Sequence, residues 1–316
     1  MKKPLKTLAL LSGVALLASN HIAAETVSTD PVGYRSTALP SGNIPFAPSF
    51  VHANSYNAQT GGIVENAESS TVTLVDGAMS VGVYDEGATY PVYYLEITEV
   101  GSDQGYVFDV ISNTATTVTV AGLLTSDFSL SGDETVAIRK HMTIGDVFQG
   151  AALQAYADSV QFYNEDGSTS QFFWDGLMWT PDFAANHSDR PVYPGHGFMV
   201  TLAAPSNLTL TGTVKTTATK VPVYAGVINF IASLAPSDAI IGELGFVSVL
   251  QAYADSVKMF SQDGMLSTDG LYYSDGIKMT KDFSSDNGSD EIKGDNSFLV
   301  TVSGNKYITL PPAYSN

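Results

Sequence analysis

The sequence contains no cysteine. A chain without thiols forms no disulfide, carries no thiolate metal site and has no cysteine that could take a lipid anchor. Folding must therefore rely on the burial of apolar side chains alone.

Positive charge is also scarce. Fourteen Lys and Arg residues stand against 32 Asp and Glu residues, which gives a formal net charge of −18. Such a chain repels nucleic acid and anionic membranes, so neither is expected as a partner. The excess of carboxylates favours solubility outside the cell, and binding of multivalent cations is the alternative interpretation.

Long apolar runs are absent beyond the N-terminus. There Lys2, Lys3 and Lys6 precede the apolar run 8–18, and small residues end at Ala24. This pattern predicts a secretory signal peptide over residues 1–24. The run is too short for a membrane-spanning helix, and no stretch of about 18 apolar residues follows it. We expect an exported protein that is periplasmic, on the outer surface or extracellular, with no transmembrane segment.

Short catalytic signatures are missing as well. The sequence has no G-x-S-x-G, H-E-x-x-H, phosphate-binding loop or strand-linked G-x-G-x-x-G, so we expect a non-enzymatic protein without a cofactor. A hydrolase that uses two carboxylates stays open as an alternative, because such residues meet only in space and leave no short motif.

An internal repeat is the strongest feature that is present. The octapeptide LQAYADSV occurs at 153–160 and again at 250–257. The sequences that follow the two octapeptides align with each other, first at an offset of 97 residues and then, after three extra residues in the second copy, at an offset of 100. At that offset FMVT (198–201) faces FLVT (298–301). The chain is therefore partly a tandem duplication.

The text that both copies share predicts an all-β fold. It consists of Asp-Gly corners and short β-branched or aromatic runs, which is typical of strands joined by tight turns. Each copy is expected to be a β module, sandwich or barrel-like, and only IGDVFQ (144–149) and IGELGF (241–246) indicate short helical turns. The shared aspartates are expected to bond backbone in turns; these pairs are Asp158/Asp255, Asp166/Asp263, Asp175/Asp275 and Asp182/Asp282.

The sequence divides into five segments. After the signal come an extended segment (25–51), a β domain (52–139), the first repeat module (140–214) and the second (215–316). Residues 221–238 resemble residues 30–50 in their Pro-Val opening, central Asn and Ala-Pro ending. If that similarity is structural, the extended segment begins the first module and the β domain is inserted into it.

Several of these motifs resemble a known family. TDPVGY near residue 30, IRKHMTIGDVF (138–148) and the series ADSVQFYN…DGLMWTP…PGHGFMV…LTLTGTV (157–214) are similar to a family of uncharacterised exported bacterial β proteins in which the module "sDxVxfyn…W…PGxGFxV…LTLTGxV" recurs. The resemblance implies export and a β fold, and no enzymatic activity. The second copy departs from the pattern, with GDNSFLV in place of PGHGFMV and without either Trp.

Metal-binding candidates are few. His187 and His196 are close in sequence, but Asn287 and Asn296 replace them in the second copy, so a loop position explains both better than a metal pair. The acidic stretch 284–296 is the best candidate for Ca²⁺, which prefers several oxygen ligands. Its ligands would be Asp286, Asp290, Glu291 and Asp295, and a solvated acidic loop is the simpler interpretation.

Aromatic residues supply the candidate ligand surface. Phe173, Trp174 and Trp179 lie close together in the first copy. An exposed row of such rings would stack on sugars, whereas packing in the β core explains the same residues and is the simpler interpretation. We therefore expect an exported β protein of the cell envelope or extracellular matrix with an adhesive, assembly or structural role. A carbohydrate-binding protein is the alternative, and possible partners are glycans or other envelope components.

Overall fold

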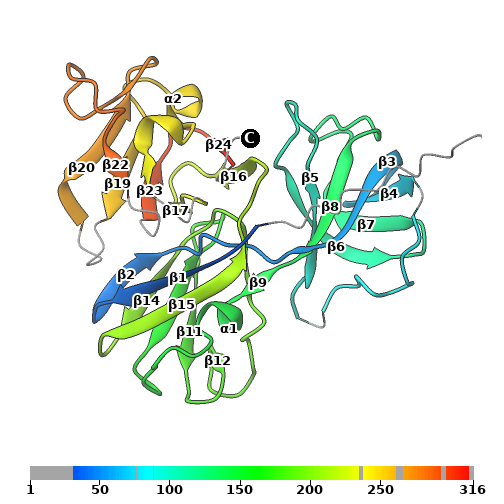
Figure 1. Cartoon of the computed structure of the whole chain (residues 1–316), viewed down its shortest axis with the longest axis horizontal. Helices are drawn as coiled ribbons and strands as arrows, with labels where there is room; N and C mark the ends of the chain where they lie inside the picture. Colours follow the sequence, from blue (N-terminus) through cyan, green and yellow to red (C-terminus); the bar gives the residue numbers. More distant parts are fainter. Residues whose placement is uncertain are drawn as a thin grey trace, which may run out of the picture.

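The protein is all-β, as its sequence predicts. The computed structural model describes residues 31–75, 77–87, 89–234, 238–260, 266–292 and 297–312. Within these ranges the strands form a closed barrel and two smaller modules of like topology (Figure 1). No helix in these ranges is both long and apolar enough to cross a membrane.

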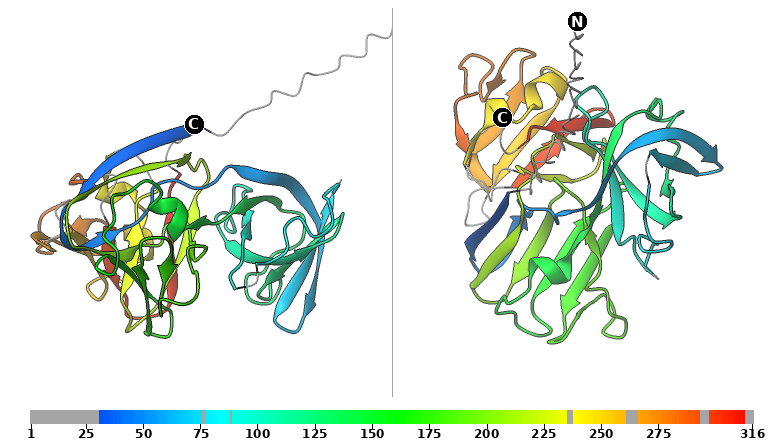
Figure 2. Two further views of the ribbon diagram at one scale, coloured as in Figure 1. Left: turned by 90° about the horizontal axis from the view of Figure 1, so that it is seen from below. Right: turned by 45° about the vertical axis from the view of Figure 1, so that its right-hand side comes forward.

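A barrel of six strands forms one body of the molecule. In order around the barrel its strands are β3 (Asn54–Asn66), β4 (Ser69–Val75), β7 (Thr117–Ala121), β6 (Val107–Asn113), β5 (Tyr93–Ile97) and β8 (Thr135–Lys140). Buried and partly covered residues alternate along the strands. In β7, Val118 and Val120 are buried while Thr117 and Thr119 are only partly covered. One face of such a strand therefore fills the interior of the barrel. The left view of Figure 2 shows the ring beside the two modules.

The first module takes strands from both sides of the barrel in sequence. Its strands are β1 (Val32–Leu39), β2 (Gly42–Phe46), β9 (Met142–Thr143), β10 (Ser159–Tyr163), β11 (Thr169–Trp174), β12 (Trp179–Thr180), β13 (Pro191–Val192), β14 (Phe198–Leu202) and β15 (Ser206–Thr213). The main sheet runs β12-β11-β10-β14-β2, and β1 pairs with β15. The chain thus leaves this module after β2, builds the barrel and returns at β9.

The second module repeats these pairings. Its strands are β16 (Thr219–Val223), β17 (Asn229–Ala232), β18 (Ala239–Ile240), β19 (Ser256–Phe260), β20 (Leu266–Ser274), β21 (Met279–Thr280), β22 (Glu291–Ile292), β23 (Ser297–Thr301) and β24 (Lys306–Leu310). The sheet β21-β20-β19-β23-β17 matches that of the first module strand for strand, and β16-β24 matches β1-β15. The duplication therefore includes the two strands before the barrel, whose counterparts are β16 and β17.

The strand pairing shows that the sequence similarity between residues 30–50 and 221–238 does not align structurally equivalent asparagines. Ile44 in β2 lies opposite Val200, whereas Asn229 in β17 lies opposite the matching Val300. The two asparagines in that comparison are therefore not equivalent. Asn229 is buried and bonds the backbone of Tyr224 through both its donor and its acceptor, so its amide closes a turn.

The helical turns lie where the sequence places them. Thr143 caps the N-terminus of helix α1 (Ile144–Val147) and forms a capping box with Asp146. Such a box satisfies backbone donors that a short helix leaves free. The counterpart in the second module is the 3₁₀ turn η1 (Ile241–Glu243) followed by α2 (Phe246–Val249).

A buried ion cluster joins the barrel to the chain that links the two modules. Glu96 of β5 bonds Arg139 of β8 at 2.9 Å (Nε to Oε2) and also accepts from Lys215, which follows β15. All three side chains are almost fully buried. Because a charge without a partner is costly in the interior, this cluster fixes the barrel against the modules and so helps to shape the space between them.

Candidate functional site

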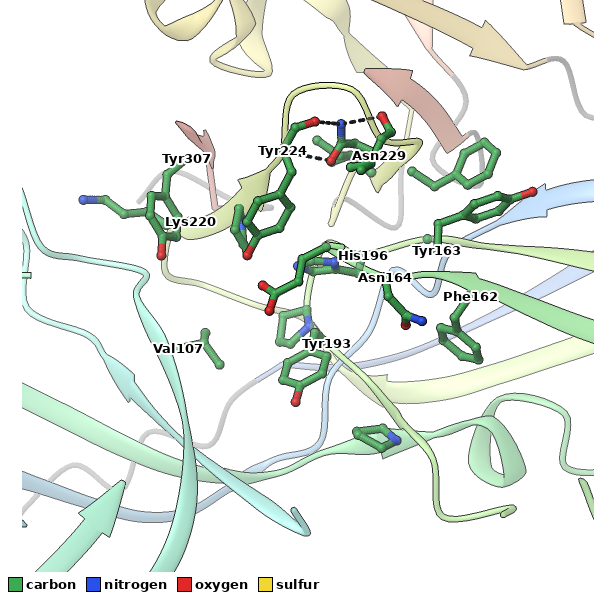
Figure 3. A pocket seen from close by; sticks show the side chains of 18 of the residues that line it. Val107, Phe162, Tyr163, Asn164, Tyr193, His196, Lys220, Tyr224, Asn229 and Tyr307 are labelled. Carbon is green, nitrogen blue, oxygen red and sulfur yellow. Dashed lines mark hydrogen bonds between the residues drawn. The ribbon is translucent and has the colours of Figure 1, made fainter. Parts of the chain in front are cut away.

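A pocket of about 520 Å³ lies where the barrel and the two modules meet (Figure 3). The barrel contributes β6 and the loop before it, the first module the loops after β10 and β13, and the second module β16, β17 and β24. We call this the junction pocket. Pockets of this size commonly hold small ligands, and a boundary between domains is a frequent place for them.

Aromatic rings form much of the wall. Tyr106 meets Tyr307 edge to face with ring centroids 5.1 Å apart, and Tyr163 meets Phe230 at 5.4 Å. Each of these pairs joins a ring of the second module to one from another part of the molecule. The further aromatic lining residues are Phe128, Phe162, Tyr193 and Tyr224. Such a wall offers apolar faces together with phenol hydroxyls.

Asp109, on β6, connects the barrel to the first module. Its Oδ1 is 2.9 Å from Nε2 of His141, and its Oδ2 accepts from the Tyr193 hydroxyl at 2.6 Å. Burial, and then the neighbouring Asp109, raise the pKa of Tyr193, so this phenol stays a donor at neutral pH. Both oxygens of Asp109 are thereby engaged and held in place.

Glu165 brings a second carboxylate to the pocket from the loop after β10. Burial, and then the neighbouring carboxylate of Glu165, raise the pKa of Tyr224, so this phenol stays protonated at neutral pH. Glu165 comes from the first module and Tyr224 from the second, and both line the pocket. The charge of Glu165 also contributes to raising the pKa of Tyr193 and of Tyr307, so its electrostatic effect extends across the pocket.

Two cations complete the lining. Arg190 lies over the rings of Tyr90 and Phe162 at 5.3 and 5.2 Å, and its Nε is buried without a hydrogen-bond partner among the described residues. Lys220 lies 3.9 Å from the ring centre of Tyr106 and donates to the carbonyl of Ser102. A buried N–H donor without a partner is uncommon in folded proteins, and Arg190 is a lining residue with such a donor.

His196 adds a neutral imidazole. Desolvation lowers its pKa to about 4, so the ring is uncharged at neutral pH. It packs against Tyr193 with centroids 5.9 Å apart. A neutral imidazole has one donor and one acceptor nitrogen, and both suit a ligand that carries hydroxyl groups.

Two glycines explain why the first module contacts the second at this point. Gly195 has φ +79°, and a Cβ built there would lie 2.5 Å from Cγ2 of Val221. A Cβ on Gly197 would lie 3.0 Å from Cβ of Phe230. The PGHG sequence therefore permits a close approach between the modules. The second copy has the sequence GDNS at these positions.

The junction pocket is built largely from residues that the two copies do not share. At the positions of Glu165, Arg190, Tyr193 and His196 the second copy has Gln262, Asp290, Lys293 and Asn296. The shared aspartates instead serve the fold. Asp158 accepts the amides of Gln154 and Ala203, and Asp255 those of Gln251 and Ser303. The residues of the first module that line the pocket therefore lie outside the sequence that both copies share.

The predicted calcium ligands do not come together within the described residues. Asp290 bonds Lys281 and the hydroxyl of Tyr272, both at 2.8 Å, and Asp286 accepts the amide of Gly288. Glu291 is exposed in β22. Asp295 lies outside the described residues. In the ranges that the structure describes, no group of three or more His, Asp or Glu side chains is placed to hold a metal ion.

The predicted ring surface is not a flat exposed row. Trp179 is only 1% exposed and packs on Phe148 in the core. Trp174 is partly buried against the same core, with its ring tilted 55° to that of Trp179. Phe173 points elsewhere and stacks on Phe183 at 5.5 Å. Core packing explains the two tryptophans, because the matching position of Trp179 is the buried Met279.

The two histidines that are close in sequence have separate roles. His187 bonds the hydroxyl of Tyr90 at 2.7 Å, and its amide donates to the carbonyl of Trp179. Asn287 makes the same backbone bond to Met279, as expected for a shared turn position. His196 instead lines the junction pocket.

Sequence reasoning missed the junction pocket because its parts meet only in space. Asp109, Tyr193 and Tyr224 come from three segments without a common motif. The available signal was the comparison of the copies, since several lining residues are those that differ between them. Comparison of the chain with protein-family models, with curated proteins and with solved structures finds no match. The resemblance to an exported β family therefore stays a prediction.

Proposed function

We propose that this chain is an exported, non-enzymatic binding protein of the cell envelope or extracellular matrix, and that the junction pocket holds a sugar. The observation that carries the proposal is a ring-lined pocket with polar groups aimed at a ligand from three parts of the fold. The signal-like N-terminus and the excess of carboxylates support a place outside the cytoplasm.

Sugar chemistry fits this lining. A pyranose offers an apolar C–H face for an aromatic ring and hydroxyl groups that both donate and accept hydrogen bonds. Glu165 can accept from such hydroxyls, Arg190 can donate, and the neutral His196 can do either. Tyr106, Tyr163 and Tyr307 offer apolar faces at the wall.

A carboxylate-dependent hydrolase is the second candidate, because Asp109 and Glu165 line the same pocket. Hydrolysis of a glycoside requires one carboxyl group that gives a proton and another that attacks or activates water. Asp109 has both oxygens occupied by His141 and Tyr193, which suits a fixed structural acceptor better than a nucleophile. We therefore favour binding without turnover.

Calorimetric titration of the full chain with a panel of neutral and acidic oligosaccharides tests the proposal. Glu165→Gln removes the negative charge and keeps the shape of the side chain. A lost hydrogen bond to a charged group is worth about 1.5–3 kcal/mol, so we expect Kd to rise by roughly tenfold to a hundredfold.

Glu243→Gln is the matched control, because Glu243 is exposed in η1 and does not line the pocket. It should bind like the parent chain, and neither variant should differ in melting temperature by more than a few degrees. Absence of binding across the panel, or equal affinity of Glu165→Gln and the parent chain, would refute sugar binding in this pocket. Release of reducing sugar would favour the hydrolase.

A further inference from the structure

Each repeat module carries an aromatic cluster at the same place on its surface. The first cluster comprises Tyr156, Phe173 and Phe183, and Phe183 lies 5.5 Å from each of the other two rings. The second cluster comprises Tyr253, Tyr273 and Phe283, with Phe283 at 5.3 and 4.8 Å from its neighbours. None of these residues lines the junction pocket. We call them the twin clusters.

Two of the three rings in each cluster are open to solvent, whereas Phe173 and Tyr273 are half-buried. Tyr156 and Phe183 are 71% and 49% exposed, and Tyr253 and Phe283 are 67% and 45% exposed. Burial in the core therefore does not explain why aromatic residues stand here. A turn of each module also carries an exposed aliphatic residue at matching positions, Leu177 in one module and Ile277 in the other.

The backbone at these rings is in a conformation that bulky residues avoid. Tyr156, Phe183, Tyr253 and Phe283 have φ between 59° and 64°. The left-handed region costs an L-residue about 1–2 kcal/mol, and Gly or Asn adopts it more readily. If only the turn mattered, a small residue would serve better. Aromatic residues nevertheless occupy both positions in both copies, so the side chains themselves have a use.

The loops that hold the rings are rigid before any ligand binds. The amide of Tyr156 donates to Trp174 at 2.7 Å, and that of Tyr253 to Ser274 at 2.9 Å. Asp182 accepts two amides of the loop after Phe183, and Asp282 does the same after Phe283. A rigid platform loses little entropy when a ligand stacks on it.

Charge narrows the class of ligand. Amide donors of the loop hold the pKa of Asp282 at about 2 and lower that of Asp182, so both clusters carry a negative charge at neutral pH. The whole chain has a net charge of −18. An anionic polysaccharide, an anionic membrane and a second copy of this chain would all be repelled. A neutral ligand with flat apolar faces and hydroxyl groups would not be repelled.

We infer that the twin clusters are two equivalent sites for the sugar rings of an uncharged polysaccharide. Two like sites suit a ligand that itself repeats, because the second contact forms within an existing complex and raises the avidity. The inference goes beyond the junction pocket and does not depend on it, since the clusters belong to the shared scaffold and the pocket to residues that the copies do not share.

Retention of the full chain on insoluble cellulose, chitin and starch tests the inference. Tyr156→Asn and Tyr253→Asn each remove a ring and place a residue that tolerates the left-handed backbone. We expect at least one of these polysaccharides to retain the parent chain, each single variant to bind about tenfold more weakly, and the double variant to lose retention. The melting temperature should not fall in any of them.

Two controls separate this inference from the pocket. Tyr34→Asn removes a ring that is 78% exposed on β1 but belongs to neither cluster, and it should be retained like the parent chain. Glu165→Gln should also be retained if the clusters act independently, even where it loses oligosaccharide binding in solution.

Four outcomes would overturn the inference. These are no retention on any of the three polymers, unchanged retention of the double variant, binding only to polylysine or to anionic vesicles, and concentration-dependent self-association that the double variant abolishes.

Discussion

At the scale of single residues, the most consequential arrangement outside the pocket is the buried cluster of Glu96, Arg139 and Lys215. Burial opposes the charge on Glu96, but Lys215 and then Arg139 outweigh it and hold the pKa of this carboxyl below its usual range. The contribution of Glu96 to stability is therefore present above the pKa of an unfolded glutamate. It is lost as the pH falls through the lower pKa of the folded state.

Lys215→Met should destabilise the protein by about 3–5 kcal/mol at neutral pH, because it leaves the negative charge of Glu96 with one partner fewer in the interior. Urea unfolding followed by tryptophan fluorescence measures this loss. The difference between variant and parent should shrink as the pH falls through the lowered pKa of Glu96 in the folded parent.

The double variant Glu96→Gln/Lys215→Met removes both members of the pair and should recover part of the lost stability. If it is no more stable than Lys215→Met, the single substitution acts through lost packing rather than through an unpaired charge.

At the scale of elements, turns and loops rather than strands distinguish the two modules. The strands pair alike in both copies, and the turn aspartates bond the same backbone groups. The loop before β14 differs in sequence from its counterpart, with PGHG in place of GDNS, and it brings Gly195 against Val221 of β16. This loop is therefore the element that brings the modules into contact beside the pocket.

Gly195→Ala should destabilise the protein by about 2–4 kcal/mol, since it combines a left-handed alanine with overpacking against Val221. Gly226→Ala is the matched control: Gly226 has φ +77° but nothing within 4 Å of an added Cβ. Gly226→Ala should lower the free energy of unfolding only by the cost of a left-handed alanine, about 1–2 kcal/mol. Equal midpoints of urea unfolding for the two variants would contradict a tight contact at Gly195.

At the scale of the whole molecule, the insertion of a barrel into one of two repeated modules creates a three-part junction. A tandem pair alone would lack the barrel groups, notably Tyr106 and Asp109, that face the pocket. Within the described residues, no barrel is inserted into the second module. The junction pocket therefore lies beside the first module, whereas the twin clusters occur on both modules.

Export is the prediction that belongs to this scale. A chain with a C-terminal tag should be recovered outside the cytoplasm, and its N-terminal residue should be Glu25 if cleavage follows Ala24. Cell fractionation with N-terminal sequencing measures both. Recovery of the full-length chain in the cytoplasm would contradict the proposal, and replacement of Leu11 by Arg in the apolar run should block export.

The sequence by itself determined the all-β class, the duplication, the short helical turns and the structural use of the shared aspartates that the structure describes; Asp263 lies outside the described residues. All of these follow from local patterns such as alternation, Asp-Gly corners and an eight-residue identity. The burial of Trp179 could not be predicted, because its strand β12 has only two residues and offers no alternation from which an inner face could be assigned.

Only the tertiary structure decided which residues meet. Asp109 and Tyr193 are 84 positions apart, yet they share a hydrogen bond, and no local pattern predicts a contact across an inserted barrel. The same holds for Glu96 and Lys215, and for the rings that each module gathers from two loops and a strand. Local sequence fixes the path of the backbone within a turn or strand. Recognition surfaces arise where distant segments pack, and that is settled by the long-range geometry of the folded chain.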